Sequence, residues 1–519
     1  MAGLAWIAPG LILLVAAGQP PKAAFRLGYS AGLAHYLISL SWLLRIPAPG
    51  APILGWLALS AFMALNTGLW VWLCWRNFPV PLVAPPGGDT TWPALARRFL
   101  VGNWAQRFAW TLFGASLWVA WEMNIARFLG GFPWNPLGAS QYRLIPLIQI
   151  ASYTGVYGLT FLPVWFSLSL LSAGFAIVGR PMLKSAWAAE AILPMATVGA
   201  VYVLGYQKVM VPESSHRLLK VALIQPSIPQ TIIWDANGAR SRLDKLLELS
   251  RASLAAHPDL IIWPEGLVPG MPRFQKEISD PITDFCRSNH VWLILGADDA
   301  KPAPGAETWD GAEFYNSSFL VDLEGRFATQ YKKRRLVIFG EYIPLVRWLP
   351  FLKYVTPIQS GFTPGEHAVN FPLKEPRANL SVLICYEDIF ADPTREYASD
   401  QTDFLVNLTN DGWFGEGAAQ WQQAAAAIFR AVENGLPLVR CANNGVTGWA
   451  DARGRIQSVL ETPERGIYGP GWLFIKVPLL DNGTPREPTY YQRYGDRFGW
   501  LCVAYALILV LPSRRVVKA

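Results

Sequence analysis

The sequence predicts a polytopic α-helical membrane bundle joined to an α/β domain, and three observations support this prediction. The chain has 519 residues, of which 52% are hydrophobic and only 16% are charged, which is too apolar for a soluble protein of this length. Uncharged stretches as long as membrane spans fill much of residues 1–207 and recur at 498–513. Between them, at about 210–490, short β-branched runs alternate with helical or loop segments.

Six candidate helices precede the polar region. They lie at 3–21, 27–44, 51–75, 108–128 (interrupted by polar residues), 152–178 and 191–207. We therefore expect about six transmembrane helices in residues 1–207 and a last one at 497–513. A signal peptide is the alternative for residues 1–18, but no Lys or Arg precedes the apolar stretch, which favours a transmembrane helix.

Charges in the connecting loops predict the orientation. Lys and Arg outnumber Asp and Glu by 11 to 3 over residues 1–205, and the two kinds nearly balance in the rest of the chain. The basic loops lie near Lys22, at 76–107 and near Arg180, and by the positive-inside rule they are cytoplasmic. The domain at 210–490 is then expected on the exoplasmic side. Because these loops account for the net charge of +7, a nucleic-acid-binding face is not expected.

The polar region is predicted to contain an α/β sheet with helices on its outer faces. The Ala-rich stretch Ala418–Asn434 is typical of such a helix. The expected strands are Leu219–Ile224, Leu260–Trp263, Trp292–Leu295, Ser318–Val321, Leu380–Ile384, Phe404–Leu408 and Leu438–Arg440.

The cysteines and the short motifs exclude several kinds of site. Cys74, Cys286, Cys385, Cys441 and Cys502 form no CxxC pair, so neither a disulfide framework nor a structural zinc site is expected. The chain has no HExxH, GxxxxGK[ST] or GxGxxG motif. We therefore predict no metal and no cofactor.

Three chemically capable side chains follow predicted strands directly. Glu265 follows Leu260–Trp263, Lys333 follows the run from Phe327, and Cys385 follows Leu380–Ile384. A thiol nucleophile needs a base, and its tetrahedral intermediate needs a cation. The combination predicts a Glu-Lys-Cys acyl-transfer site. Singly, each residue has a plain alternative: a solvated turn Glu, a basic edge around Lys333, or a buried structural thiol.

The order of the motifs resembles that of the apolipoprotein N-acyltransferases, the membrane-anchored branch of the nitrilase superfamily. The resemblance covers most of the chain and includes the N-terminal helices and the last helix. The matching motifs are Gly131-Phe-Pro-Trp134, Val221–Gln230 with Trp234-Asp235, Trp263-Pro264-Glu265, Tyr331-x-Lys333, Phe339-Gly-Glu341-Tyr342, Cys385-Tyr386-Glu387 and Asn410–Phe414.

This resemblance implies a role for each site residue. Cys385 is expected to be the nucleophile, Glu265 the general base, and Lys333 the cation that stabilises the oxyanion. The supporting residues are expected to be Glu341, which orients Lys333, the backbone N–H of Tyr386 as an oxyanion donor, and Glu387 and Trp234, which shape and gate the site. A positive charge near Cys385 is expected to lower its thiol pKa from about 8.5.

The resemblance also implies the fold, the reaction and the location. The fold is a nitrilase-like (αββα) domain on a helix bundle in the bacterial inner membrane, with the domain on the periplasmic side. The reaction is a ping-pong transfer of an acyl chain from a glycerophospholipid, through a Cys thioester, to the α-amine of a diacylglyceryl-cysteine apolipoprotein. Phosphatidylethanolamine is the expected donor.

Some features of the sequence have a second reading or depart from the family. Trp413 and Phe414, with the segment Arg347–Tyr354, are either ordinary core or a lipid-facing gate at the membrane interface.

Arg335 and Ile338 replace the usual His and Pro, which puts the donor preference in question. Relatives usually have seven helices before the domain, so either the first is missing here or the true start lies upstream.

Two other functions compete with acyl transfer. A membrane-tethered amidohydrolase would use the same triad with water as the second nucleophile, although hydrolases of this superfamily are typically soluble. A catalytically inactive lipid-binding scaffold is the other alternative, and the presence of all three triad residues argues against it.

Overall fold

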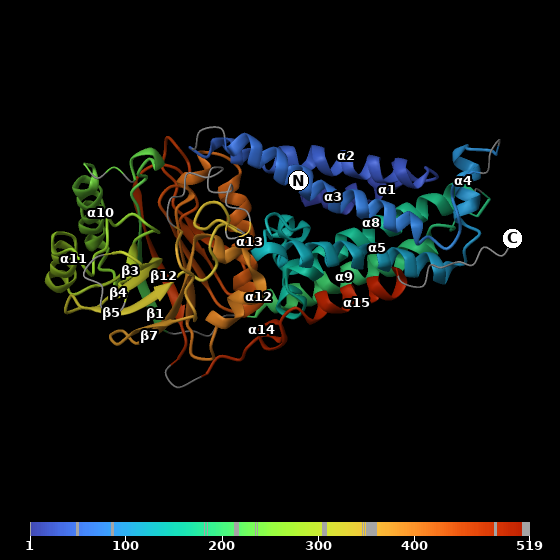
Figure 1. Ribbon diagram of the computed structural model, residues 1–519. Coiled ribbons are helices and arrows are strands. Elements are labelled where there is room, and N and C mark those ends of the chain that lie inside the picture. Colours follow the sequence, from blue (N-terminus) through green and yellow to red (C-terminus); the bar gives the residue numbers. More distant parts are fainter. Residues whose placement is uncertain are drawn as a thin grey trace. The chain divides into compact units, whose positions relative to one another are not determined.

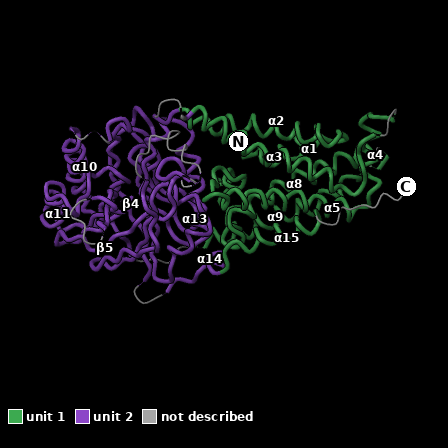
Figure 2. The backbone as a smooth tube through the Cα atoms, viewed as in Figure 1, with its two compact units in different colours: residues 1–44, 53–211, 494–519 green, residues 45–52, 212–493 purple. Residues whose placement is uncertain are grey.

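The chain folds into two compact units, which Figure 2 colours separately. The computed structural model describes residues 2–47, 51–84, 88–180, 182–183, 185–211, 217–233, 235, 237–303, 309–344, 346, 348, 361–481 and 485–510. Unit 1 comprises residues 1–44, 53–211 and 494–519, and unit 2 comprises 45–52 and 212–493.

Unit 1 is helical (Figure 1). Its long helices are α2 (Pro21–Ser39), α3 (Ala51–Arg76), α5 (Trp104–Ile125), α8 (Val156–Gly179), α9 (Ala188–Met210) and α15 (Arg497–Val510). The shorter ones are α1 (Ala8–Ala16), α4 (Trp92–Phe99), α6 (Ile145–Ile148) and α7 (Ala151–Thr154). A reciprocal capping box starts α5, in which the side chains of Asn103 and Gln106 each accept a hydrogen bond from the other residue's backbone N–H.

Three of the described helices are long and apolar enough to cross a membrane: α3, α8 and α9. Two thirds of the apolar window of α8 is buried inside the structure, against 22% for α9. The helix α8 therefore forms the core of unit 1, whereas α9 presents most of its apolar surface outward, where lipid can cover it.

The first apolar run, expected as one helix over 3–21, is divided. A 3-10 helix (Ala2–Trp6) precedes α1, and α1 has nine residues. At about 1.5 Å per residue, α1 by itself is too short to span a bilayer. Gly18, with a φ of +73°, and Pro20 separate α1 from α2, because the chain must reverse direction there.

One carboxylate inside unit 1 has several hydrogen-bond partners. The Glu122 carboxylate on α5 accepts hydrogen bonds from Trp118, from the backbone N–H of Leu137 and from the Thr160 hydroxyl, at 3.1, 2.8 and 2.7 Å. Its side chain thus points into the unit, as expected for a carboxylate in an apolar segment.

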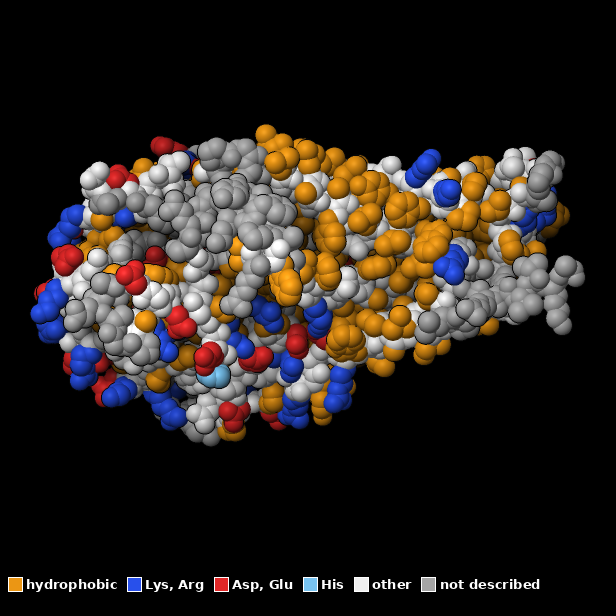
Figure 3. Space-filling view, viewed as in Figure 1, with side chains coloured by type: hydrophobic (Ala, Val, Ile, Leu, Met, Phe, Trp, Pro, Cys, Tyr) orange, Lys and Arg blue, Asp and Glu red, His pale blue; other side chains and the backbone are white. Residues whose placement is uncertain are grey.

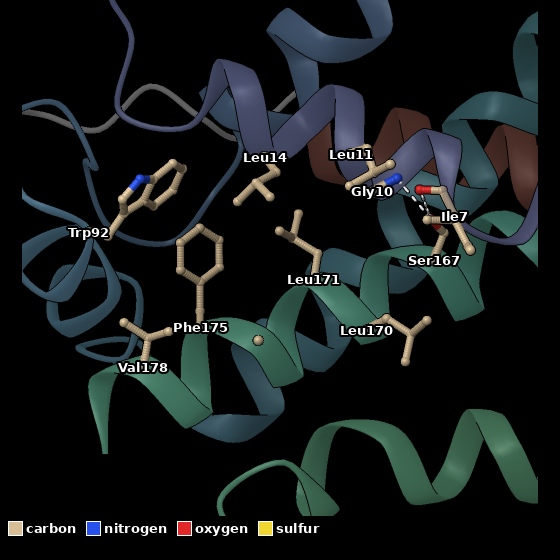
Figure 4. Close-up of a pocket in the computed structure, with 11 residues that line it drawn as sticks. Ile7, Gly10, Leu11, Leu14, Trp92, Ser167, Leu170, Leu171, Phe175 and Val178 are labelled. Carbon is tan, nitrogen blue, oxygen red and sulfur yellow. Dashed lines mark hydrogen bonds between the residues drawn. The ribbon is translucent and has the colours of Figure 1, made fainter. Parts of the chain in front are cut away.

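An apolar cavity of about 370 Å³ lies between α1, α4 and α8. Leu14 of α1 and Leu171 of α8 point toward each other, and Phe175 and Trp92 complete one end (Figure 4). The Ser167 hydroxyl accepts a hydrogen bond from the backbone N–H of Gly10 on α1, at 2.8 Å. It donates one to the backbone oxygen of Ile7, the N-cap residue of α1, at 2.9 Å. The cavity is therefore a hydrocarbon environment.

The surfaces of the two units differ in composition. In the face shown in Figure 3, hydrophobic side chains cover much of unit 1, and Lys, Arg, Asp and Glu side chains gather on unit 2. This distribution is typical of a lipid-embedded part and a water-exposed part of one chain.

Unit 2 contains two mixed six-stranded sheets. One has the order β12-β1-β2-β3-β4-β5 and the other β11-β10-β9-β8-β7-β6. The first sheet consists of β1 (Arg217–Gln225), β2 (Leu260–Ile262), β3 (Trp292–Lys301), β4 (Glu313–Val321), β5 (Phe327–Lys332) and β12 (Gly471–Leu479). The second consists of β6 (Asn370–Leu373), β7 (Ala378–Ile384), β8 (Phe404–Thr409), β9 (Leu438–Ala442), β10 (Gly448–Ala450) and β11 (Ile456–Val459).

Each sheet has three parallel strands at its centre: β1, β2 and β3 in one, and β7, β8 and β9 in the other. The two sheets face each other, since the Cys441 thiol on β9 donates to the backbone oxygens of Ile224 and Ile262 on β1 and β2, at 3.3 and 3.2 Å. The carboxyl ends of parallel strands share one edge of a sheet, where loops can present functional side chains.

Helices cover the outer faces of both sheets. On the first sheet, α10 (Ala239–Ser253) and α11 (Lys276–Asn289) bury a core that includes Leu246, Phe285 and Leu293. On the second, α13 (Ala419–Asn434) packs Ala427 and Ile428 near Leu438 of β9. Together with the short α12 (Ala391–Thr394), these layers give the αββα architecture that the sequence predicts. The short α14 (Tyr490–Tyr494) ends the unit.

Candidate active site

Cys385 lies at a sharp turn directly after β7. It is the first residue of a 3-10 helix (Cys385–Ile389) and has a φ of +50°, the left-handed region that favours glycine. Such a conformation costs roughly 1–3 kcal/mol in a non-glycine residue and persists only where its surroundings impose it. Here the side-chain amides of Asn407 on β8 and Gln423 on α13 donate to the Cys385 backbone oxygen, at 3.0 and 3.1 Å.

Glu387 connects the Cys385 turn to the end of β5. Its buried carboxylate accepts hydrogen bonds from the backbone N–H groups of Ile384, Arg334 and Arg335, at 2.8, 2.7 and 3.0 Å. The Tyr331 hydroxyl donates to it as well, at 2.7 Å. Because Lys333 lies between Tyr331 and Arg334, this one carboxylate fixes both the thiol turn and the backbone that carries the ammonium group.

Lys333 is the centre of a buried charge cluster. Its side chain is 1% exposed, and Nζ donates to Oε1 of Glu265 at 3.1 Å and to Oε1 of Glu341 at 2.9 Å. Burial opposes the charge on Lys333, but the charges of the two carboxylates outweigh it and raise its pKa well above the ordinary value. This direction favours a charged Lys333 at neutral pH.

Asn316 on β4 completes the cluster and was not found from the sequence. Its Nδ2 donates to Oε1 of Glu265 at 2.8 Å and to Oε1 of Glu341 at 2.9 Å, so it bridges the same two carboxylates as Lys333. The sequence did contain a signal for it. Residues 316–318 are polar and directly precede the apolar residues 319–321 of the same strand, and a buried amide needs hydrogen-bond partners.

Backbone groups position the two carboxylates from other directions. The backbone N–H of Asn410, just after β8, donates to Oε2 of Glu265 at 3.1 Å. The backbone N–H of Val337 donates to Oε2 of Glu341 at 2.8 Å. Glu265 is thus held at three points, with its side chain 9% exposed.

The structure brings Cys385, Glu265 and Lys333 together from three different strand ends. The charges of Glu265, Lys333 and Glu341 all act on the Cys385 thiol. Burial, followed by the charge of Glu265, raises the pKa of this thiol well above its ordinary value, and the lowering by Lys333 is the smaller effect. The expectation of a lowered thiol pKa is therefore wrong, because it neglected desolvation.

Three further predicted site residues, Tyr386, Trp413 and Phe414, lie in short 3-10 helices. Tyr386 follows Cys385 in the turn, and its ring packs edge-to-face on Phe390 with centroids 5.1 Å apart. Trp413 and Phe414 are half-buried in a 3-10 helix (Asp411–Phe414), so a gating role for them stays a prediction.

Part of the predicted gate falls on residues that are not described. Trp234 lies outside the described residues, and of the segment 347–354 the structure describes only Trp348, which is 82% exposed. Among the described residues, no group of three His, Cys, Asp or Glu could hold a metal ion.

The chain combines a carbon-nitrogen hydrolase domain with a helical unit that contains candidate membrane spans. The sequence profile of the carbon-nitrogen hydrolase family matches residues 220–468, which contain the whole cluster. The profile of the apolipoprotein N-acyltransferase N-terminal domain matches residues 1–169.

Full-length relatives agree with both profiles. An apolipoprotein N-acyltransferase from Geobacter metallireducens is 34% identical over 99% of this chain and 91% of its own length. One from Brucella melitensis is 28% identical over 92% of this chain and 88% of its own length. The chain belongs to the apolipoprotein N-acyltransferase family, and it is a multi-pass membrane protein.

Among solved structures, an amidase from Nesterenkonia sp. is 19% identical, with a TM-score of 0.37, over 52% of this chain and 93% of the amidase.

Proposed function

We propose that Cys385, Glu265 and Lys333 transfer a fatty acyl chain from a glycerophospholipid to the N-terminal α-amine of a diacylglyceryl-cysteine apolipoprotein. The observation that carries this proposal is the buried ammonium of Lys333, bridging two carboxylates beside a thiol on a strained turn. The printed name of the relatives supplies the acceptor class, and the glycerophospholipid donor is our own assignment.

In the first half-reaction the Cys385 sulfur attacks the carbonyl carbon of a donor ester. Because burial raises the pKa of the thiol, it is protonated at neutral pH and needs a base as it attacks. Glu265 accepts that proton and returns it to the departing alkoxide, so a lysophospholipid leaves and a thioester stays on Cys385.

Lys333 stabilises the negative charge that develops on the carbonyl oxygen. Its ammonium is fixed by Glu265 and Glu341, so little reorganisation is needed when the oxyanion forms. The backbone N–H of Tyr386, at the same turn, is the proposed second donor to the oxyanion.

In the second half-reaction the acceptor amine attacks the thioester. The nitrogen–carbon bond forms, the carbon–sulfur bond breaks, and the amine proton passes through Glu265 to the departing sulfur. The products are an amide-linked acyl chain and the free Cys385 thiol.

The apolar character of unit 1 fits the substrates, since both are lipids anchored in a bilayer. We assign phosphatidylethanolamine as the donor and place unit 2 on the periplasmic side of the inner membrane, on the basis of the basic loops at 22–26, 76–107 and 180–184. Trp413, Phe414 and Trp348 are then proposed to contact lipid near the site.

Transfer of a labelled acyl chain tests the function. The full-length protein in detergent is incubated with phosphatidylethanolamine labelled in its sn-1 chain and with a diacylglyceryl-cysteine peptide. Label is expected on the peptide amine. Cys385→Ala should abolish the transfer, whereas Cys286→Ala, on α11 in the core of unit 2, should retain it. Label appearing only as free fatty acid would show a hydrolase.

A further inference from the structure

One ionisable side chain next to the site has no role in the mechanism above. Asp298 lies in β3, and its side chain is exposed although the residues on both sides, Ala297 and Asp299, are fully buried. Among the described residues, no group hydrogen bonds to its carboxylate. An acidic residue inside a central strand is uncommon, so it calls for an explanation.

The strand register places Asp298 beside the catalytic cluster. It is directly opposite Asn316 in the antiparallel β3–β4 ladder, so the two side chains leave the same face of the sheet with Cβ atoms about 4.5–5.5 Å apart. Asn316 is the residue that bridges Glu265 and Glu341.

A second observation places the same face of β3 against Glu265. Gly296 is two residues before Asp298 and therefore shares its face. A Cβ atom at Gly296 would lie 2.7 Å from Cα of Glu265, which is closer than real contacts allow. The strand thus approaches Glu265 so closely that only glycine fits at position 296. Asp298 lies two residues further along the same face of the strand.

The neighbouring acid shows what a structural aspartate looks like in this strand. Asp299 is fully buried on the opposite face and accepts hydrogen bonds from Arg273 at 2.9 and 3.0 Å and from Gln330 at 2.5 Å. Its hydrogen bonds hold the sheet to the segment that contains Arg273. Within the described part of the chain, Asp298 has no such hydrogen bonds.

The electrostatic surroundings make Asp298 a proton acceptor that operates near neutral pH. Desolvation by the enclosing protein, and then the charges of Glu341 and Glu265, raise the pKa of Asp298 to about 7, although the side chain still meets solvent. Lys333 compensates part of the charge of these two carboxylates. The ionisable groups Asp299, Tyr315 and Lys332 lie on the other face of the ladder.

The second half-reaction has a proton that the triad does not remove. A free α-amine has a pKa of about 7.7–8.0, so the acceptor is mostly an ammonium at neutral pH. It must lose one proton before it can attack, and a second one when the amide forms. Glu265 passes the second proton to the departing sulfur, which leaves the first without an acceptor. The donor half-reaction has no such surplus proton.

We propose that Asp298 binds the α-ammonium group of the acceptor and accepts its first proton. An N–H bond of the ammonium breaks, an O–H bond forms on the Asp298 carboxylate, and the neutral amine attacks the thioester on Cys385. The proton then passes to water, which the exposed side chain of Asp298 can reach. This inference rests on the proposed function.

Separate measurement of the two half-reactions tests the inference. Full-length protein is acylated with phosphatidylethanolamine, freed of excess donor, and mixed with a diacylglyceryl-cysteine peptide. Asp298→Asn should form the thioester within about 2-fold of the wild-type rate and lose it to the peptide about 10-fold more slowly at pH 7. The difference should vanish near pH 9, where the amine is already neutral. Asp298→Glu should restore most of the rate at pH 7.

Two controls separate proton transfer from a structural effect. Hydroxylamine, which is uncharged at pH 7, should cleave the thioester of Asp298→Asn and of the wild type equally fast. Asp284→Asn, an exposed acid on α11, should change neither half-reaction.

The outcomes distinguish the inference from the proposed function. Equal slowing of both half-reactions, a slower reaction with hydroxylamine, or unchanged transfer to the peptide at pH 7 would overturn the role of Asp298 alone. If the wild-type protein forms no thioester at all, the proposed function and this inference both fail.

Discussion

The side-chain amide of Asn316 donates a 2.8 Å hydrogen bond to Oε1 of Glu265, the same oxygen that accepts from Lys333. This neutral donor and the cation therefore fix the proposed base together. Asn316 also reaches Glu341, so one amide sets the spacing between the two carboxylates that hold the ammonium group.

Asn316→Ala should slow thioester formation by roughly 10- to 100-fold, because it removes the hydrogen bond to the proposed base, and a bond to a charged group is worth about 1.5–3 kcal/mol. Stopped-flow or quench measurement of the first half-reaction checks this value. Asn316→Asp should be slower still, since it adds a third negative charge to the cluster. Wild-type rates in Asn316→Ala would show that Lys333 and the backbone position Glu265 without the amide.

Lys333→Met should destabilise unit 2 by roughly 3–5 kcal/mol, because it leaves two buried carboxylates without their cation. The pKa of Lys333 is raised, so its stabilising charge is fully present at neutral pH and is lost only as the pH rises beyond its ordinary value of 10.5. Thermal unfolding in detergent should show a lower midpoint for the variant throughout pH 5–9. A midpoint unchanged from the wild type would contradict a buried, charged Lys333.

Glu387→Gln should lower the thermal midpoint and also slow thioester formation. Either orientation of the new amide directs its NH₂ group at backbone N–H donors, so hydrogen bonds worth about 1–3 kcal/mol are lost at the turn. The effect should appear in kcat more than in KM for the donor, because the change misplaces Cys385 and Lys333 relative to each other. Loss of donor affinity alone would instead indicate the substrate-shaping role predicted from the sequence.

Glu265→Gln should make Cys385 more reactive toward iodoacetamide while abolishing acyl transfer. The charge of Glu265 raises the pKa of the thiol, so its removal lets Lys333 lower that pKa and increases the thiolate fraction near pH 7. One pKa unit corresponds to about a 10-fold faster alkylation. Cys385→Ala gives the background from other cysteines. Slower alkylation of Glu265→Gln would mean that Glu265 already holds the thiol proton in the resting protein.

The orientation in the membrane can be tested with cysteines introduced into the Cys385→Ala variant, since the other four native cysteines are buried. Asp244→Cys on α10 should react with a membrane-impermeant maleimide in intact spheroplasts. Arg97→Cys in the basic loop should react only after the membrane is permeabilised. The reverse pattern would place unit 2 in the cytoplasm.

Much of the fold follows from local sequence patterns. Uncharged stretches locate the long helices, and each of the seven β-branched runs from Leu219 to Arg440 coincides with a strand of one of the two sheets. The first helix was misjudged because hydropathy is blind to backbone geometry: the apolar run divides at Ile7 into a 3-10 helix and α1, and α1 ends before Gly18 and Pro20.

The sequence indicated the residues proposed for the chemistry of the site, but not the neighbouring side chains that surround them. Glu265, Lys333 and Cys385 each follow a strand, and parallel strands bring their ends together. Asn316 and Asp298 could not be found in this way, because they lie within strands and depend on the β3–β4 register. The pKa of Cys385 was mispredicted because the degree of burial of a thiol is a tertiary property.

The central claim is that the Cys385 sulfur carries the acyl chain, and mass spectrometry of the intact intermediate tests it most directly. Full-length protein is incubated, without acceptor, with a phosphatidylethanolamine of defined acyl chains. It is then digested, and the mass of the peptide that contains Cys385 is measured. The account predicts the added mass of one acyl chain on Cys385, removable by hydroxylamine or by the acceptor peptide. An acyl chain on another residue, or an unmodified Cys385 while the peptide is still acylated, would contradict it.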